Sequence, residues 1–101
     1  MTVAAVVTAA GYGTRLGSTL PKALVPVAGE PLVAHAVRRI ARVASRVVVT
    51  APSTHLDDFT RVLAGLLATL VAGAETRQGS VALGLEALAP APTDIVLVHD
   101  A

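Results

Sequence analysis

The chain has no cysteine and no tryptophan, and it has one phenylalanine and one tyrosine among its 101 residues. The missing thiols exclude disulfides, thiolate zinc sites and cysteine nucleophiles, and they fit a reducing compartment. Because aromatic anchors are so scarce, the core has to be built from small and branched aliphatic residues, which dominate a composition that is 53% hydrophobic. Such a composition is typical of a compact α/β layer protein.

Charge is equally scarce, since 15% of the residues are charged and the net charge is +1. Binding to duplex nucleic acid or to an anionic membrane surface needs a basic patch, so we expect neither partner. The longest apolar stretch, residues 62–74, is too short for the roughly 20 residues of a transmembrane helix. The start MTVAAVVTAA lacks the basic region of a signal peptide. We therefore expect a cytoplasmic protein that does not bind membranes.

The apolar residues of the chain fall into short runs. Residues 3–9, 46–50 and 94–98 are almost continuously apolar, which predicts strands buried on both faces. A further short strand is expected within 68–73, and residues 22–27 are expected to be extended. Because these strands alternate with helical segments, we predict a mainly parallel sheet joined by right-handed crossovers.

Three segments between these runs carry apolar residues at helical spacing. Pro31 suits the first position of the first helix, and the third helix spans 79–88. Either Ser53 or Thr54 can cap the second helix, and Thr54 with Asp57 forms a capping box there. The residues expected to face the core are Val33, Val37, Ile40, Ala44, Phe59, Val62, Leu63, Leu66, Leu67, Leu70, Val81, Leu85 and Leu88. Helices on both faces of a parallel sheet would make a three-layer α/β sandwich.

The loop after the first strand, residues 9–22, reads AAGYGTRLGSTLPK. It lies at the carboxyl end of that strand, the edge at which open α/β sheets bind ligands. Gly11 and Gly13 let backbone amides approach an anion closely. Arg15 brings a planar fork suited to phosphate oxygens, and Lys22 brings a mobile positive charge. Glycines and cations in one loop favour phosphate binding, with a plain tight turn as the alternative.

Two common nucleotide-binding motifs do not fit this loop. The chain has no Gly-Lys dipeptide, so a P-loop is excluded here. The dinucleotide fingerprint needs a third glycine where Leu16 stands, and an acidic residue after the strand that here ends in Thr50 and Ala51. NAD is therefore not expected as the ligand.

The motif AAGYGTRLG followed by PK resembles the opening signature of nucleotidyltransferases that act on phosphorylated acceptors. Two further segments, AETRQGSVALGLEAL at 74–88 and DIVLVHDA at 94–101, narrow the resemblance to the 2-C-methyl-D-erythritol 4-phosphate cytidylyltransferase family. The resemblance implies a Rossmann-like nucleotidyltransferase fold of the nucleotide-diphospho-sugar transferase-like type. It also implies a truncated domain, because chains of this family are longer.

Site residues are carried over from the family at the matching positions of this chain. The nucleotide-binding residues implied are Ala9, Ala10, Gly11, Gly13, Arg15, Lys22, Ala74, Glu75, Ser80, Asp100 and Ala101. Arg15 and Lys22 would be the catalytic cations on the triphosphate, and residues 76–80 would border the cytidine, with Ser80 in direct contact. Asp100 would hold Mg²⁺ or another divalent cation.

Two positions depart from the family pattern. The family commonly has Gly-Gly before the 76–80 segment, where this chain has Gly73 and Ala74. The Cβ of Ala74 would stand where backbone could approach the cytosine, which bears on the base contact. Thr8 stands at the end of the first strand where the family commonly has proline.

The reaction implied is transfer of a cytidylyl group from CTP to 2-C-methyl-D-erythritol 4-phosphate, with release of pyrophosphate, in isoprenoid precursor biosynthesis. Both reactants are anions, so positioned cations rather than a general base would lower the barrier. Residues 1–101 would form the amino-terminal nucleotide-binding part of a single domain, and full-length members are usually homodimers. Two alternatives stay open: a related nucleotidyltransferase acting on a pentitol or sugar phosphate, and a non-catalytic nucleotide-binding half-domain.

Overall fold

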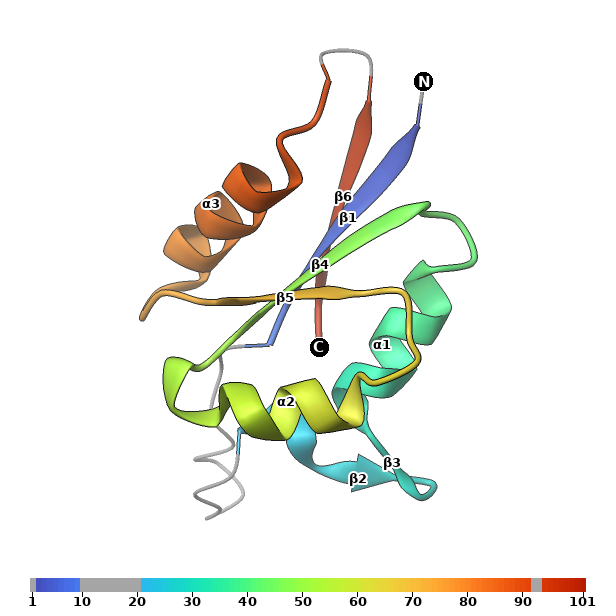
Figure 1. Ribbon diagram of the computed structural model, residues 1–101, viewed down its shortest axis with the longest axis vertical. Helices are drawn as coiled ribbons and strands as arrows, with labels where there is room; N and C mark the ends of the chain where they lie inside the picture. Colours follow the sequence, from blue (N-terminus) through green and yellow to red (C-terminus); the bar gives the residue numbers. More distant parts are fainter. Residues whose placement is uncertain (1, 10–20, 92–93) are drawn as a thin grey trace.

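The computed structural model describes residues 2–9, 21–91 and 94–101. Four parallel strands form one sheet in the order β5-β4-β1-β6 (Figure 1). The strands are β1 (Val3–Thr8), β4 (Arg46–Ala51), β5 (Thr69–Ala72) and β6 (Ile95–Asp100). The predicted α/β fold with a parallel sheet is confirmed, and each predicted strand lies within two residues of its expected bounds.

The central strand β1 is apolar on both faces, as its sequence VAAVVT predicts. Its residues from Ala4 to Val7 have no exposed surface. Ala5 and Val7 belong to the larger hydrophobic cluster, whereas Ala4 and Val6 belong to a smaller cluster on the opposite face. This alternation follows the period of two residues in a strand, and it requires cover on both sides of the sheet.

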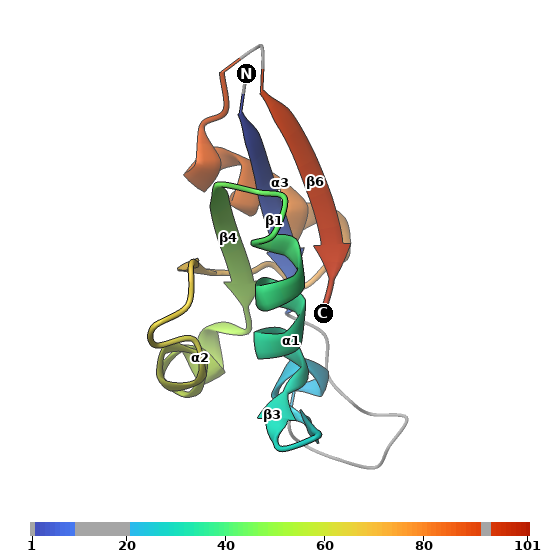
Figure 2. The ribbon, with the colours of Figure 1, turned by 90° about the vertical axis from the view of Figure 1, so that its right-hand side faces the viewer.

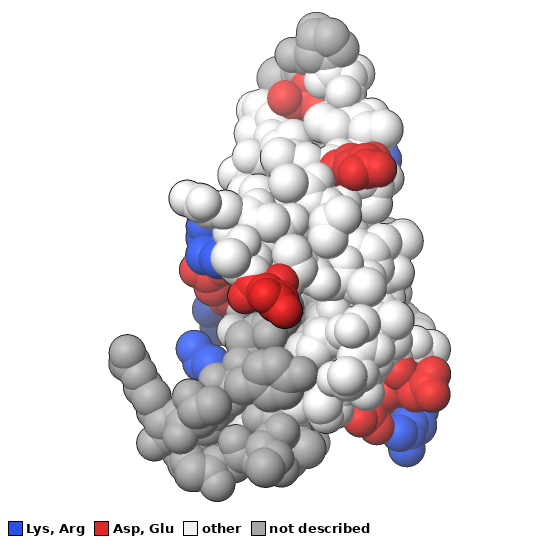
Figure 3. Space-filling view, turned by 90° about the vertical axis from the view of Figure 1, so that its left-hand side faces the viewer, with Lys and Arg blue, Asp and Glu red and all other residues white. Residues whose placement is uncertain are grey.

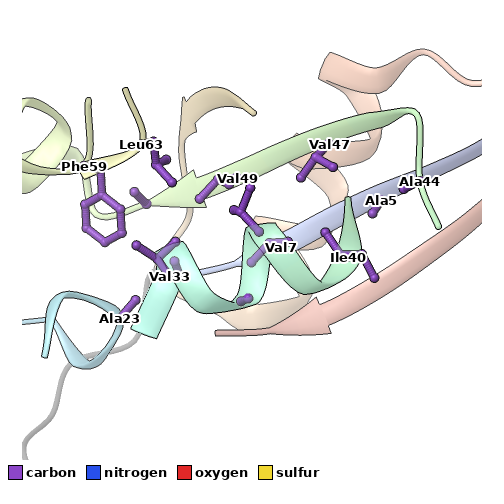
Figure 4. Close-up of a cluster of buried hydrophobic side chains, with 14 residues drawn as sticks. Ala5, Val7, Ala23, Val33, Ile40, Ala44, Val47, Val49, Phe59 and Leu63 are labelled. Carbon is purple, nitrogen blue, oxygen red and sulfur yellow. The ribbon is translucent and has the colours of Figure 1, made fainter. Parts of the chain in front are cut away.

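Helices provide that cover. Residues of α1 (Leu32–Ile40) and α2 (Leu56–Val62) belong to the larger cluster, and Leu88 of α3 (Arg77–Leu88) belongs to the smaller one. Figure 2 shows α1 and α3 on opposite sides of the sheet. In Figure 4, Phe59 of α2 and Val33 of α1 lie beside the end of β4 in the larger cluster. The structure is therefore the predicted three-layer sandwich.

Helix α3 starts two residues earlier than predicted because Thr76 caps it. The Oγ1 atom of Thr76 accepts a hydrogen bond from the backbone N–H of Gly79 at 3.0 Å. The buried residues of the helix are Ser80, Gly84 and Leu88. A Cβ atom at Gly84 would lie 2.5 Å from Cγ1 of Val6. The helix therefore approaches β1 more closely than any side chain at position 84 would allow.

The segment 22–27 is extended only at its end. Lys22–Leu24 forms a 3-10 turn, η2, which satisfies the amide of Val25 by accepting its hydrogen bond at the carbonyl of Lys22. The chain then forms a two-stranded antiparallel hairpin from β2 (Pro26–Val27) and β3 (Glu30–Pro31). Because Pro31 pairs across this hairpin, it precedes α1 and does not occupy the first helical position predicted for it.

Helix α2 begins at Leu56, after a second 3-10 turn, η3 (Ser53–His55). The N-cap position is held by His55 and not by Thr54, so the predicted capping box is wrong. The turn itself is the reason. The N–H of His55 donates to the carbonyl of Pro52 at 3.0 Å, which places Thr54 inside the 3-10 turn.

The same helix ends at Val62, earlier than the apolar spacing predicts. Gly65 has a φ of 80°, a left-handed conformation that turns the chain toward β5. Phe59 and Leu63 are buried, as predicted. Leu67 lies beyond the turn and is 49% exposed, so its predicted place in the core is wrong.

Strand β6 differs from the prediction in its burial. Ile95 and Val98 are 45% and 42% exposed, so a strand buried on both faces is the wrong description here. In the described sheet, β6 pairs only with β1 and forms an edge. Leu97 packs against the larger cluster and Val96 against the smaller one, which anchors the strand from both sides.

The described surface carries few charges. Figure 3 shows a face on which small blue and red groups interrupt a mostly uncharged surface. Three of the basic side chains, Arg38, Arg61 and Arg77, form ion pairs with acidic neighbours. This face shows no broad basic patch among the residues drawn in colour. No helix in the described part of the chain is long and apolar enough to cross a bilayer.

Candidate functional site

A cleft of about 230 Å³ opens at the carboxyl ends of β1 and β6. The order β5-β4-β1-β6 means that the chain moves outward from β1 in one direction and then returns to add β6 on the other side. The space beyond two such neighbouring strands is the topological switch point, where open α/β sheets bind their ligands. The residues lining the cleft are Thr8, Lys22, Ala74, Glu75, Thr76, Arg77, Ser80, Asp100 and Ala101.

Asp100 is the acidic centre of this cleft. Its Oδ1 atom accepts a hydrogen bond from Thr8 Oγ1 at 2.6 Å and another from Arg77 Nε at 2.8 Å. These partners lower the pKa of Asp100 below its usual value, with the Thr8 hydroxyl as the largest cause and the Arg77 contact next. The carboxylate therefore stays ionised at neutral pH, as a cation ligand must.

Ser80 lies in the first turn of α3 and also lines the cleft. Its side chain is buried, and its Oγ atom accepts a hydrogen bond from Ala74 N at 3.0 Å and donates one to Ala74 O at 3.2 Å. A serine hydroxyl has one proton and two lone pairs, and these two bonds use the proton and one lone pair. Ser80 thus shapes the 74–76 segment and still lines the cleft.

Ala74 carries a methyl group at a position where the resemblance leads us to expect glycine. A Cβ atom built at Gly79 would lie 2.7 Å from the Cβ of Ala74. The Ala74 methyl group is therefore directed at the first turn of α3, which accepts it because position 79 has no side chain. This close contact explains how the chain accommodates alanine at position 74 while the residue still borders the cleft.

The predicted nucleotide-binding residues fall into three groups. The cleft brings together six of them, namely Lys22, Ala74, Glu75, Ser80, Asp100 and Ala101. Ala9 does not line it: the side chain is buried in the larger cluster, and the N–H donates to Thr50 O at 2.8 Å. Ala10, Gly11, Gly13 and Arg15 lie outside the described residues.

Thr8 is the cleft residue that sequence reasoning missed as a functional group. In the sequence it was noted as a residue at the end of the first strand where the family commonly has proline, with no functional role attached to its hydroxyl. The signal that could have found it is strand alternation, which places Thr8 on the same face as Ala4 and Val6, the face covered by α3. In the structure, Thr8 is paired with Asp100 in the β1–β6 register.

The donor atoms of the cleft fit a divalent cation that is held largely by its nucleotide. Among the described residues, no group of three or more His, Cys, Asp or Glu side chains could hold a metal alone. Mg²⁺ commonly takes one or two carboxylates and completes its shell with phosphate oxygens and water. Asp100 and Glu75 bring that number of carboxylates to the cleft.

Comparison with known proteins assigns the chain to a family. The family model described as "IspD: 2-C-methyl-D-erythritol 4-phosphate cytidylyltransferase" matches residues 3–101. The chain belongs to the IspD family. The family suggested by the three sequence motifs is thereby confirmed.

The IspD relatives are longer than this chain. A relative from Streptomyces avermitilis, named 2-C-methyl-D-erythritol 4-phosphate cytidylyltransferase, is 48% identical over 97% of this chain and 42% of its own length. One of the same name from Cereibacter sphaeroides is 44% identical, over 99% of this chain and 46% of its own length. The bifunctional enzyme IspD/IspF of Granulibacter bethesdensis is 43% identical over all of this chain and 26% of its own length. The chain thus spans less than half the length of these relatives.

Solved IspD structures share the fold. The 2-C-methyl-D-erythritol 4-phosphate cytidylyltransferase of Thermus thermophilus matches with a TM-score of 0.72 at 36% identity, over 99% of this chain and 41% of that one. The 4-diphosphocytidyl-2C-methyl-D-erythritol synthase of Anaerococcus prevotii matches with a TM-score of 0.73 at 25% identity, over 98% and 42%. The chain therefore has the predicted Rossmann-like nucleotidyltransferase fold in part.

Proposed function

We propose that the chain is the amino-terminal, nucleotide-binding part of an enzyme that transfers a cytidylyl group from CTP to 2-C-methyl-D-erythritol 4-phosphate. The observation that carries this proposal is the meeting of Lys22, Ser80 and Asp100, from three separate motifs, in one cleft at the switch point of the sheet. The two substrates are proposed because the chain belongs to the IspD family. The enzyme would be cytoplasmic, as expected from the apolar start without a basic region and the short apolar runs, and homodimeric, as expected from the resemblance.

The chemistry is an in-line displacement. An ionised phosphate oxygen of the acceptor attacks the α-phosphorus of CTP and forms the new P–O bond. The bond from the α-phosphorus to the oxygen bridging the β-phosphate breaks, and pyrophosphate leaves. No general base is needed, because the second pKa of a phosphate monoester, about 6, leaves it ionised at neutral pH. The task left to the protein is to position cations where negative charge accumulates.

Lys22 is the described residue suited to that task. It lines the cleft at the start of η2, and its side chain is exposed. Its ammonium group would contact the triphosphate, with Arg15 as a second cation on the evidence of the motif alone. Asp100, with Glu75 nearby, would hold Mg²⁺, which when bound neutralises phosphate charge. Arg77 would balance the charge of Asp100 when the cleft holds no nucleotide.

The cytosine would lie against the first turn of α3. The capping bond of Thr76 and the two bonds between Ser80 and Ala74 make this segment a rigid border of the cleft. Rigid backbone groups can distinguish bases by their hydrogen-bonding edges without a change of shape on binding. We infer that this border selects CTP over UTP, ATP and GTP.

Pyrophosphate release tests the proposal. The purified chain is incubated with Mg²⁺, each of the four nucleoside triphosphates in turn, and either 2-C-methyl-D-erythritol 4-phosphate, a pentitol phosphate or a sugar phosphate. Release that requires CTP and the methylerythritol phosphate supports the proposal. Release with another acceptor indicates a related nucleotidyltransferase instead.

One second candidate is a nucleotide-binding half-domain without catalysis. The observation behind it is that the described cleft accounts for the nucleotide side of the proposed reaction, in a chain that covers 42% and 46% of the lengths of two relatives. Calorimetric titration with CTP separates the two functions. Saturable CTP binding without pyrophosphate release indicates the half-domain, and absence of CTP binding contradicts both.

A further inference from the structure

We propose that Thr8 is a positioning residue: its hydroxyl fixes the carboxylate of Asp100 through Oδ1, so that Oδ2 is the oxygen offered to a divalent cation. The proposal rests on the proposed function in one respect, namely that Asp100 binds the cation of a metal–nucleotide complex. It adds a residue to that site whose role is to set the orientation of the ligand.

The sheet itself fixes the position of the Thr8 hydroxyl. Thr8 is the last residue of β1 and Asp100 the last of β6, and the two are paired in the strand register. The N–H of Ala101 donates to Thr8 O at 3.0 Å, which continues the pairing one residue past Asp100. Thr8 is 8% exposed, and as a β-branched residue it has few χ1 rotamers. Its donor is therefore held in one place before any ligand arrives.

Arg77, the other partner of Asp100, is less constrained. Its side chain is 58% exposed and that of Asp100 is 62% exposed. Exposed ion pairs contribute little free energy because water screens them and long side chains lose entropy in them. The Arg77 contact can therefore open when a cation or phosphate enters, whereas the Thr8 contact, made by a buried hydroxyl, can persist.

The two hydrogen bonds leave one oxygen of the carboxylate available. Thr8 and Arg77 both donate to Oδ1 at 2.6 and 2.8 Å, and no described residue donates to Oδ2. With Oδ1 engaged, Asp100 is arranged to bind through a single oxygen. This suits Mg²⁺, which needs near-octahedral geometry and keeps several water or phosphate ligands. Hydrogen bonds to the ligating group from a neighbouring side chain are known to set ligand orientation.

Mn²⁺ binding provides the test, because Mn²⁺ substitutes for Mg²⁺ and its free ion is measured directly by electron paramagnetic resonance. The chain is titrated with Mn²⁺ at saturating CTP as the unmodified protein, Thr8→Val, Thr8→Ser and Asp100→Asn. Thr8→Val removes the hydroxyl and keeps the branched shape. Its Mn²⁺ affinity should fall about tenfold, the lower end of the usual effect of such changes. Thr8→Ser restores the hydroxyl and should restore binding.

A matched control lies directly before the first residues of the same two strands. Thr2 Oγ1 donates to Asp94 Oδ1 at 2.7 Å, outside the cleft. Thr2→Val removes the same kind of Thr–Asp hydrogen bond and should leave Mn²⁺ binding unchanged. Thermal melting and CTP affinity without metal show that each variant is folded and binds the nucleotide.

Each outcome of the titration supports or overturns the role proposed for Thr8. Unchanged Mn²⁺ affinity in Thr8→Val, with a loss in Asp100→Asn, overturns the role of Thr8 and leaves the proposed function intact. An equal loss in Thr8→Ser and Thr8→Val overturns it also, since the hydroxyl would then not be responsible. Unchanged affinity in Asp100→Asn overturns the cation site on which the inference rests. Failure of the proposed function is recognised separately in the unmodified chain, by the absence of CTP binding or of pyrophosphate release.

Discussion

At the scale of single residues, the cleft contains two described cations in different situations. Arg77 is paired with Asp100, whereas no carboxylate of residues 2–9, 21–91 or 94–101 pairs with Lys22. An ammonium group without a carboxylate partner can meet a phosphate without first breaking an ion pair. Lys22 is therefore the described side chain from which the largest effect on phosphate chemistry is expected.

Replacement of Lys22 by alanine should reduce the rate of pyrophosphate release about 10²- to 10³-fold, the usual effect of removing one donor that stabilises transition-state charge. The reaction is followed with CTP, Mg²⁺ and the methylerythritol phosphate. Arg42→Ala removes an exposed cation that does not line the cleft and should leave the rate unchanged. Normal turnover by Lys22→Ala would contradict the proposed mechanism.

Thr50 carries a buried hydroxyl whose removal should change the stability of the fold. It is fully buried, and its Oγ1 atom has no hydrogen-bond partner among the described residues. A buried hydroxyl without a partner destabilises a protein, so Thr50→Val should raise the free energy of unfolding by about 1 kcal/mol. Urea denaturation measures the change. Thr69→Val, at an exposed position of β5, is the control and should change stability much less.

At the scale of elements, the contact of α3 with β1 positions the border of the cleft. The helix carries Arg77 and Ser80 in its first turn, directly after its cap Thr76, and Gly84 lies against Val6 one turn later. The distance between helix and sheet at Gly84 therefore controls how far Arg77 and Ser80 stand from Asp100. A change in this packing should affect both stability and the cleft.

The replacement Gly84→Ala tests this packing. Alanine usually favours a helix, but here its Cβ would lie 2.5 Å from a Val6 methyl group. The overpacking should lower the free energy of unfolding by about 1–3 kcal/mol. Ala82→Gly, at an exposed position of the same helix, should cost about 1 kcal/mol through helix propensity alone. A more stable Gly84→Ala protein, measured by urea denaturation, would show that α3 can move away from β1 freely.

At the scale of the whole molecule, the sheet was predictable from the sequence because β1 and β4 are apolar on both faces. The exposure of β6 could not be predicted from the sequence, because it depends on the order of the strands in the sheet and not on the residues of β6. The end of α2 was also predicted wrongly. The left-handed turn at Gly65 ends the helical segment, although the apolar spacing continues to Leu70.

The candidate site likewise contains residues that the motifs predicted and a contact that they did not. Motifs located Lys22, Ser80 and Asp100 because their residue types and order resemble those of one family. The bond between Thr8 and Asp100 joins residues 92 positions apart and depends on the β1–β6 register. No local pattern contains that register. The hydrogen bond between Thr8 and Asp100 therefore depends on the tertiary pairing of two strands, which the motifs do not contain.

The pairing of β1 with β6 should also make the stability of the molecule depend on pH. Asp94 binds the hydroxyl of Thr2 at one end of the pair, and Asp100 binds that of Thr8 at the other. The pKa of each carboxyl is lowered from 3.8, mainly by these side-chain hydrogen bonds. Because the folded protein then binds fewer protons than the unfolded chain, both groups stabilise the fold fully above the unfolded pKa.

This stabilisation should be lost as the pH falls from about 5 through the lowered folded pKa values, where the carboxylates take up protons. Urea denaturation between pH 3 and pH 7 should therefore show a falling midpoint below about pH 5. The double variant Thr2→Val/Thr8→Val removes the main cause of both shifts, so its midpoint should depend less on pH over that range. A midpoint that falls equally steeply in the double variant would show that other carboxylates govern the acid sensitivity, and that the strand ends contribute nothing to it.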